Sequence, residues 1–235
     1  MIMAEVSAVF PPRNSKLGLQ SWAREMVALA RVTLRPPDYP SGPLPRGDGR
    51  SVLLVPGFLS GDWSMARLRS FLTALGYRIE TAGIFFNPGP TAGMIAQLDD
   101  ALLRLSVTGP VAIVGQSLGG VLARSLALSH PDRVCCVVTL CSPIRFPVTT
   151  PLEPFARMLA PFHDAGWVAR RHEIAKPLPV PVTAIYSTDD GIVDWRQCLQ
   201  DEAPGSENIG VHGAHTTIGS NPEALAAIAF ALARR

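Results

Sequence analysis

Gly115-Gln116-Ser117-Leu118-Gly119 is the stretch that decides the fold. It follows an apolar run, 111–114, that has the length of a buried strand, and it precedes a helix-like segment. At such a strand-to-helix turn, glycines let the chain bend so sharply that the serine hydroxyl stands clear of the sheet. The pattern predicts that Ser117 is a nucleophile; the alternative is a glycine turn with an idle serine.

Strands and helices alternate around this turn from Ser51 onward. Asn221 with Pro222 is expected to open the last helix, and Gly76 to end the first helix of this region. Short apolar strands between helices predict an α/β fold, with a mostly parallel central sheet of about six strands and helices on both faces. We expect strands at 52–55, 77–82, 111–114, 134–140, 182–186 and 209–211, and helices at 63–75, 91–105, 118–128 and 221–233.

Two segments depart from this alternation. Residues 143–179 are rich in proline and aromatic residues, too long for an ordinary connection and too apolar for a solvated linker. We expect them to form a helical cap over a substrate pocket, the alternative being a packing excursion. An amphipathic pattern at 14–34 predicts a helix, and a Pro/Gly-rich linker follows it. Residues 1–50 are therefore expected to pack on the domain 51–235; the alternative is a lipid-contacting helix.

Composition excludes several classes of protein. The chain has 235 residues, a net charge of +2 and scattered basic residues, so we expect one domain that does not bind nucleic acid. No apolar run approaches the ~18 residues that span a bilayer, which leaves only transient lipid-surface contact. Residues 1–10 lack the pattern of a secretory signal. The oligomeric state is not predicted.

The cysteines favour a reducing compartment. Cys135, Cys136, Cys141 and Cys198 match neither a zinc pattern nor a redox motif, so we expect buried core thiols in a cytoplasmic protein. His212 and His215 are the only close histidine pair, and nothing near them in the sequence completes a metal site. We predict no metal and no cofactor.

A serine nucleophile needs a base, and His215 is the candidate. It lies in a loop of small residues after the last expected strand and before the last helix. His212 competes with it, but is expected to be a packing residue at the strand end. His163 and His172 lie in the cap segment, where they can line the pocket, although we expect them to face solvent.

The base in turn needs a carboxylate, and three candidates follow the strand 182–186. Asp190 is favoured because Gly191 beside it offers freedom at positive φ for a tight turn. Asp189 is the alternative, and Asp194 is expected to cap the next helix. The developing oxyanion also needs backbone N–H donors, for which we predict Leu118, after the nucleophile, and Phe58, in the loop after the first sheet strand.

From Ser51 to Arg235 the chain resembles the α/β-hydrolase superfamily, most closely its compact bacterial lipases and esterases. The resemblance rests on Val55-Pro56-Gly57-Phe58, on the serine motif, and on Ile185–Val193 followed by Gly213-Ala214-His215. It implies a Ser-His-Asp triad of Ser117, His215 and Asp190 acting on small-molecule esters with an apolar acyl or alcohol group. The alternatives are an acyltransferase or amidase with the same triad, or a non-catalytic binding protein. The substrate-binding side chains predicted are Phe58, Phe85, Phe86, Phe146, Phe155 and Trp167.

Overall fold

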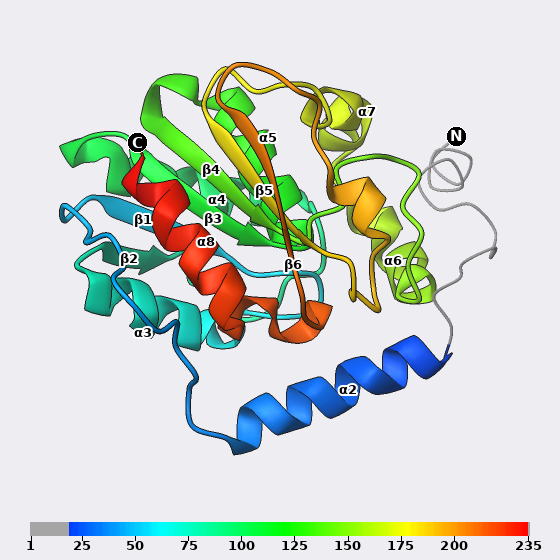
Figure 1. Ribbon diagram of the computed structural model, residues 1–235. Coiled ribbons are helices and arrows are strands. Elements are labelled where there is room, and N and C mark those ends of the chain that lie inside the picture. The colour runs from blue at the N-terminus through cyan, green and yellow to red at the C-terminus, as the bar shows by residue number, and fades with distance from the viewer. Residues whose placement is uncertain (1–18, 235) are drawn as a thin grey trace.

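The computed structural model describes residues 19–234, and within them six parallel strands form one sheet (Figure 1). The sheet order is β2-β1-β3-β4-β5-β6, which places β3 and β4 at the centre. The predicted fold class is therefore confirmed. The strands are β1 (Ser51–Val55), β2 (Arg78–Thr81), β3 (Val111–Gln116), β4 (Val134–Leu140), β5 (Val182–Ser187) and β6 (Ser206–Val211).

Helices cover both faces of this sheet, as the apolar strands require. On one face, α3 (Ala66–Leu75) and α8 (Pro222–Ala233) pack against alternate strand residues such as Val114. On the other face, α4 (Ala92–Leu105) and α5 (Leu118–Ser129) pack against the intervening strand residues, such as Ile113. Successive strand residues therefore belong to two separate cores.

The predicted helix ends are confirmed where the sequence carries strong signals. Gly76 ends α3 in the left-handed conformation, and the side chain of Asn221 accepts a hydrogen bond from Ala224 N at the start of α8. The last strand is longer than predicted, because β6 begins at Ser206. It is an edge strand with few buried side chains, so its first three residues carry no apolar signal.

The segment 143–179 contains two helices, α6 (Glu153–Leu159) and α7 (Ala165–Ile174) (Figure 1). The side chain of Asp164 caps α7 by accepting from Trp167 N at 2.7 Å. Trp167 and Ile174 are buried in the same core as α4 and α5. α7 is therefore anchored to the domain, whereas α6 exposes Phe155 and Met158.

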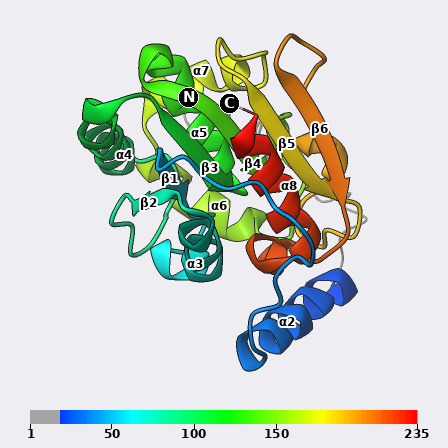
Figure 2. The ribbon, with the colours of Figure 1, turned by 60° about the vertical axis from the view of Figure 1, so that its left-hand side comes forward.

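The N-terminal helix α2 (Leu19–Leu34) lies as a separate rod beside the domain (Figures 1 and 2). The part of the predicted helix before Leu19 lies outside the described residues. Ser21 and Glu25 are buried, whereas Trp22 and Leu29 are 42% and 40% exposed. Part of the apolar pattern that predicts the helix is therefore exposed, whereas Met26 and Val32 are half-buried.

Residues 35–50 connect α2 to β1 without regular secondary structure. Tyr39 stacks on Phe71 of α3, and Gly47 N donates to Leu75 O at 2.8 Å. This linker is therefore held along α3.

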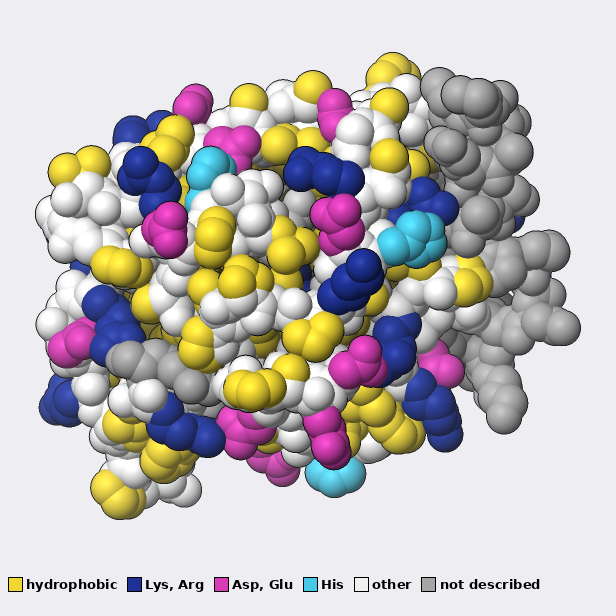
Figure 3. Space-filling model, turned by 90° about the horizontal axis from the view of Figure 1, so that it is seen from above, with side chains coloured by type: hydrophobic (Ala, Val, Ile, Leu, Met, Phe, Trp, Pro, Cys, Tyr) yellow, Lys and Arg dark blue, Asp and Glu magenta, His cyan; other side chains and the backbone are white. Residues whose placement is uncertain are grey.

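Charge on the molecular surface is mixed. On the face in Figure 3, Lys and Arg side chains alternate with Asp and Glu side chains, with small apolar groups between them. This face offers no basic patch for nucleic acid. None of the described helices combines the length and apolar character that a membrane crossing requires.

Ile113 provides a test of the core. It is fully buried in the central strand β3, so Ile113→Ala should lower the free energy of unfolding by about 2–5 kcal/mol. Val107→Ala, at a side chain that is 81% exposed, should change it by at most about 0.5 kcal/mol. Denaturant unfolding measures both, and equal effects would contradict the assigned layers.

Candidate active site

The turn at Ser117 has the strained backbone that the sequence motif predicts. Its φ of 53° and ψ of −125° are unfavourable for a residue with a side chain and cost about 1–3 kcal/mol. Ser117 N donates to Leu140 O at 2.7 Å, which ties the turn to β4. A Cβ atom at Gly119 would overlap the carbonyl oxygen of Val55, so only glycine lets α5 start this close to β1.

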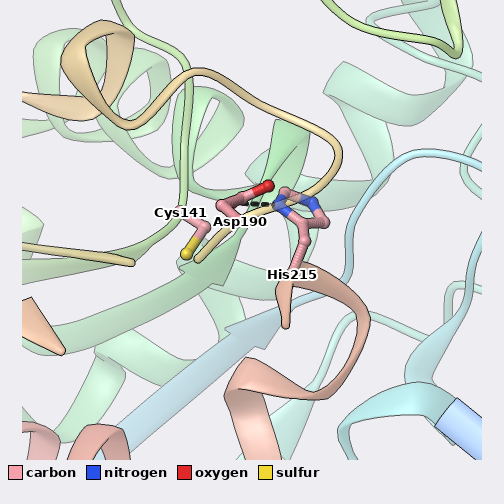
Figure 4. Close-up of side chains that lie close together, drawn as sticks. All are labelled: Cys141, Asp190 and His215. Carbon is pink, nitrogen blue, oxygen red and sulfur yellow. Dashed lines mark hydrogen bonds and ion pairs between the residues drawn. The ribbon is translucent and has the colours of Figure 1, made fainter. Parts of the chain in front are cut away.

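The structure brings Asp190 and His215 together. Asp190 follows β5, His215 follows β6, and His215 Nδ1 lies 2.7 Å from Asp190 Oδ2 (Figure 4). The other carboxylate oxygen accepts from the backbone N–H groups of Ile192 and Val193 at 2.8 and 2.7 Å. Both side chains are buried, so the carboxylate is fixed and the imidazole keeps its second nitrogen for another partner.

The loop of His215 also lies against the end of the strand that carries Ser117. Gln116 Nε2 donates to His215 O at 3.0 Å. Gln116, which directly precedes Ser117, thus contacts the backbone of His215.

Opposing effects act on the imidazole of His215. Burial lowers its pKa, but the charge of Asp190, the hydrogen bond to Asp190 and the charge of Glu25 together raise the pKa above its ordinary value of 6.5. The arrangement therefore stabilises a positive charge on this ring.

The competing residues of the sequence form a different pair. His212 Nδ1 lies 3.2 Å from Asp189 Oδ2, and both side chains are largely exposed. Asp194 accepts from Arg196 N at 3.0 Å and caps the following turn, which confirms the prediction for it.

The prediction that Gly191 is needed for a positive φ is wrong, because its φ is not in the left-handed region. A Cβ atom there would come within 2.9 Å of Ser21 O and of Glu25 Cγ, both on α2. Gly191 is therefore required for the close approach of the N-terminal helix, a contact that no local pattern could indicate.

Phe58 and Leu118, the predicted oxyanion donors, both lie at the mouth of this site. A Cβ atom at Gly57 would come 3.2 Å from Ser117 Cβ, so the loop carrying Phe58 passes directly beside the serine. Within the described residues, neither Phe58 N nor Leu118 N donates to a backbone oxygen of a turn or loop.

Asn87 holds the loop of Phe58 in place, and the sequence analysis missed it. Its side-chain Nδ2 atom donates to Pro56 O at 2.9 Å, and its backbone carbonyl oxygen accepts from Leu59 N at 2.9 Å. Asn87 is fully buried. Its position after the second strand gave no sequence signal beyond a turn residue.

Cys141 completes a cluster of three groups with Asp190 and His215, whose ligand atoms all lie within 4.8 Å of one another (Figure 4). This cluster was not evident from the sequence, which brings no cysteine near His215. Burial raises the pKa of the Cys141 thiol well above its ordinary value, which favours the protonated form beside the Asp190–His215 pair.

A cavity of about 150 Å³ opens at Ser117, between the sheet edge and the helices α6 and α7. Its lining is mostly apolar and includes Phe58, Phe146 and Trp167. Phe85, Phe86 and Phe155 do not line it; their side chains are exposed by 87%, 48% and 50%. These three aromatic residues lie in turns or on the outer face of α6, which the sequence pattern could not distinguish from the inner face.

Besides Thr150, two polar side chains of the cap also reach this cavity. The expectation that His163 faces solvent is wrong, since it is half-buried and lines the cavity, whereas His172 is exposed as expected. His163 Nε2 lies 3.3 Å from Pro88 O, and burial lowers its pKa. Arg171 is the other polar side chain, and it is buried.

Comparison with known proteins agrees with this geometry. The family model described as the alpha/beta hydrolase fold matches residues 55–170. The mitochondrial palmitoyl-protein thioesterase ABHD10 of Rattus norvegicus is 23% identical over 223 residues, covering 76% of this chain and 73% of the relative.

Solved structures show the same fold. The metagenome-derived lipolytic enzymes LipS and LipT include a chain with a TM-score of 0.58 and 17% identity, covering 83% of this chain and 99% of that one. The thioesterase domain from the curacin biosynthetic pathway has a TM-score of 0.56 and 15% identity, covering 78% and 92%.

The chain therefore has the α/β-hydrolase fold, as the motifs predicted. It is similar to proteins named as lipolytic enzymes and thioesterases.

The raised pKa of His215 can be measured. Its imidazole should titrate above 6.5 in NMR spectra, and Asp190→Asn should lower that pKa because the carboxylate charge is lost. The stability that the pair contributes should be present below pH 6.5 and lost as the pH rises through the raised value. Asp189→Asn, next to it in the chain, should leave the titration of His215 unchanged. An equal response to both substitutions would contradict the assigned pair.

Proposed function

We propose that the protein is a serine hydrolase that cleaves carboxylic esters and thioesters with an apolar acyl or alcohol group through an acyl-enzyme. The observation that carries the proposal is the buried Asp190–His215 pair beside a strained serine that opens into an apolar cavity. Bond cleavage at a carbonyl needs a nucleophile, a base and an oxyanion site, and the groups for each lie at this one edge of the sheet.

In the proposed first step, the Nε2 atom of His215 takes the proton of Ser117 as its Oγ atom bonds to the substrate carbonyl carbon. The oxygen of that carbonyl becomes negative and is held by the N–H groups of Phe58 and Leu118. Asp190 keeps the imidazole oriented and stabilises its positive charge.

In the second step, the bond to the alcohol or thiol breaks, and the leaving group takes its proton from His215. Water then repeats the attack on the acyl-enzyme and releases the acid. An alcohol or amine acceptor in place of water would make the same groups an acyltransferase or amidase. The rat relative is named as a palmitoyl-protein thioesterase, which supports including thioesters. That relative is also named as mitochondrial, so the cytoplasmic location stays a prediction.

The test is hydrolysis of p-nitrophenyl esters and matched thioesters of increasing acyl length. Ser117→Ala should lower kcat by roughly 10³-fold or more and abolish labelling by a fluorophosphonate, because the attacking oxygen is gone. Asp190→Asn should lower kcat by roughly 10³- to 10⁴-fold.

The exposed pair supplies the matched controls. Asp189→Asn and His212→Ala should keep kcat within about threefold, since neither side chain reaches the buried site. Full activity of Ser117→Ala would overturn the proposal, and release of acyl-alcohol or amide products with an added acceptor would identify an acyltransferase.

A further inference from the structure

The side chain of Glu25, on α2, is buried in the middle of the candidate active site. Only 1% of the residue is exposed, although most of its helix faces solvent. Its Oε1 atom accepts from Gly191 N at 2.8 Å and from His215 N at 2.9 Å. Its Oε2 atom accepts from the N and Oγ1 atoms of Thr216, both at 2.9 Å. One carboxylate thus receives four hydrogen bonds, which matches its full capacity.

These four donors belong to the two loops that must meet for catalysis. Gly191 directly follows Asp190, and His215 is the imidazole residue itself. The two loops are also joined by the Asp190–His215 hydrogen bond, by Ser187 Oγ, which donates to Gly213 O at 2.6 Å, and by the exposed Asp189–His212 pair. The carboxylate of Glu25 therefore joins the backbones of both loops. The distance between the Asp190 and His215 side chains depends on how these backbones are held.

The negative charge of Glu25 also raises the pKa of the His215 imidazole. No ion pair joins Glu25 to a Lys or Arg among the described residues. The groups that face His215 are Asp190 from the loop after β5, the Cys141 thiol at the end of β4, and Glu25 from α2. Two carboxylates and a protonated thiol thus surround the ring, and the more distant carboxylate adds to the stabilisation of its positive charge.

We propose that Glu25 is a positioning residue of the active site, and that α2, which lies outside the residues matching the family, fixes the geometry of the Asp190–His215 pair. The inference rests on the proposed function. A misplacement on the order of 1 Å can cost about 10²-fold in rate, so a residue that only holds the two loops in place can control kcat.

Glu25→Gln in the full chain is the first test. The amide keeps the volume but replaces one acceptor oxygen by an NH₂ group that faces donors, so kcat should fall by about 10- to 100-fold while KM changes by less than about threefold. Loss of the negative charge should also move the acidic limb of the pH profile of kcat/KM to lower pH, since His215 then holds its proton less tightly. A merely structural residue would not shift that limb.

Matched variants separate the outcomes. Glu223→Gln alters a glutamate that accepts from His212 N at 2.9 Å near the same loop, and it should leave kcat and the pH profile unchanged. Thr216→Val removes the hydroxyl that contacts Glu25 Oε2 at 2.9 Å and Glu25 O at 3.2 Å, but it leaves the three backbone donors to the carboxylate, so it should cause a smaller loss and serves if Glu25→Gln folds poorly. Wild-type kcat and pH profile in a folded Glu25→Gln enzyme would overturn the inference. Activity that does not depend on Ser117 would instead overturn the proposed function.

Arg171, in the wall of the cavity, supports a second inference that also rests on the proposed function. The residue is 91% buried, since its exposed fraction is 9%. Its Nη1 atom donates to Val168 O at 2.8 Å, but its buried Nε atom has no hydrogen-bond partner, and no carboxylate pairs with it among the described residues. A guanidinium is always charged, and an unpaired buried charge is costly.

We infer that Arg171 binds a carboxylate carried by the substrate, at a distance from the reacting carbonyl. The matched substrates are p-nitrophenyl hexanoate and mono-p-nitrophenyl adipate, whose acyl chains have equal length but differ by a terminal carboxylate. Arg171→Met should lower kcat/KM for adipate relative to hexanoate by about tenfold or more, because a charge-assisted hydrogen bond is lost. Arg170→Met, at the exposed neighbour, should keep the ratio. An unchanged ratio in Arg171→Met would overturn this inference, while hexanoate hydrolysis reports separately on the proposed function.

Discussion

The backbone at Ser117 is the constraint on which the site depends. A residue with a side chain is held at φ 53°, and the surrounding chain must offset that cost. The turn is anchored by the hydrogen bond from Ser117 N to Leu140 O, and it is permitted by glycine where α5 begins beside β1. Because β3 leads into this turn and Leu140 belongs to β4, the position of the hydroxyl follows from the buried centre of the sheet.

The proposed acid and the proposed base are positioned in a different way. Asp190 and His215 lie on loops after β5 and β6, toward the edge of the sheet, where strand packing alone fixes less. Here polar contacts replace apolar packing. Two backbone N–H groups hold the carboxylate of Asp190, and the buried carboxylate of Glu25 receives donors from both loops. The serine thus depends on the core, whereas its partners depend on a hydrogen-bond network that the N-terminal helix completes.

Much of the fold was predictable because its signals are local. Apolar runs marked the buried strands, and residues such as Gly76 and Asn221 marked helix ends. The residues of the candidate triad were also readable, since each stands in a short motif after a strand.

What the sequence could not show depends on contacts between distant segments. Glu25 is a buried acidic residue on a helix that the sequence marked only by its apolar residues. A side chain at position 191 would collide with that helix, so the glycine there depends on a contact between distant segments. Periodicity likewise could not show which aromatic residues of the cap face the cavity. Phe146 and Trp167 line it, whereas Phe155 on α6 is exposed and does not.

The linker at 35–50 gives the placement of α2 a further consequence. The covalent connection keeps α2 at a high local concentration beside the surface that it binds. This connection consists of an exposed, proline-rich segment. Cleavage of one peptide bond there would leave every strand of the sheet intact but turn an intramolecular contact into the association of two chains. Such a nicked protein would keep its circular dichroism spectrum. On dilution, however, the helix would dissociate, and the loop that carries His215 would lose the hydrogen bonds to Glu25.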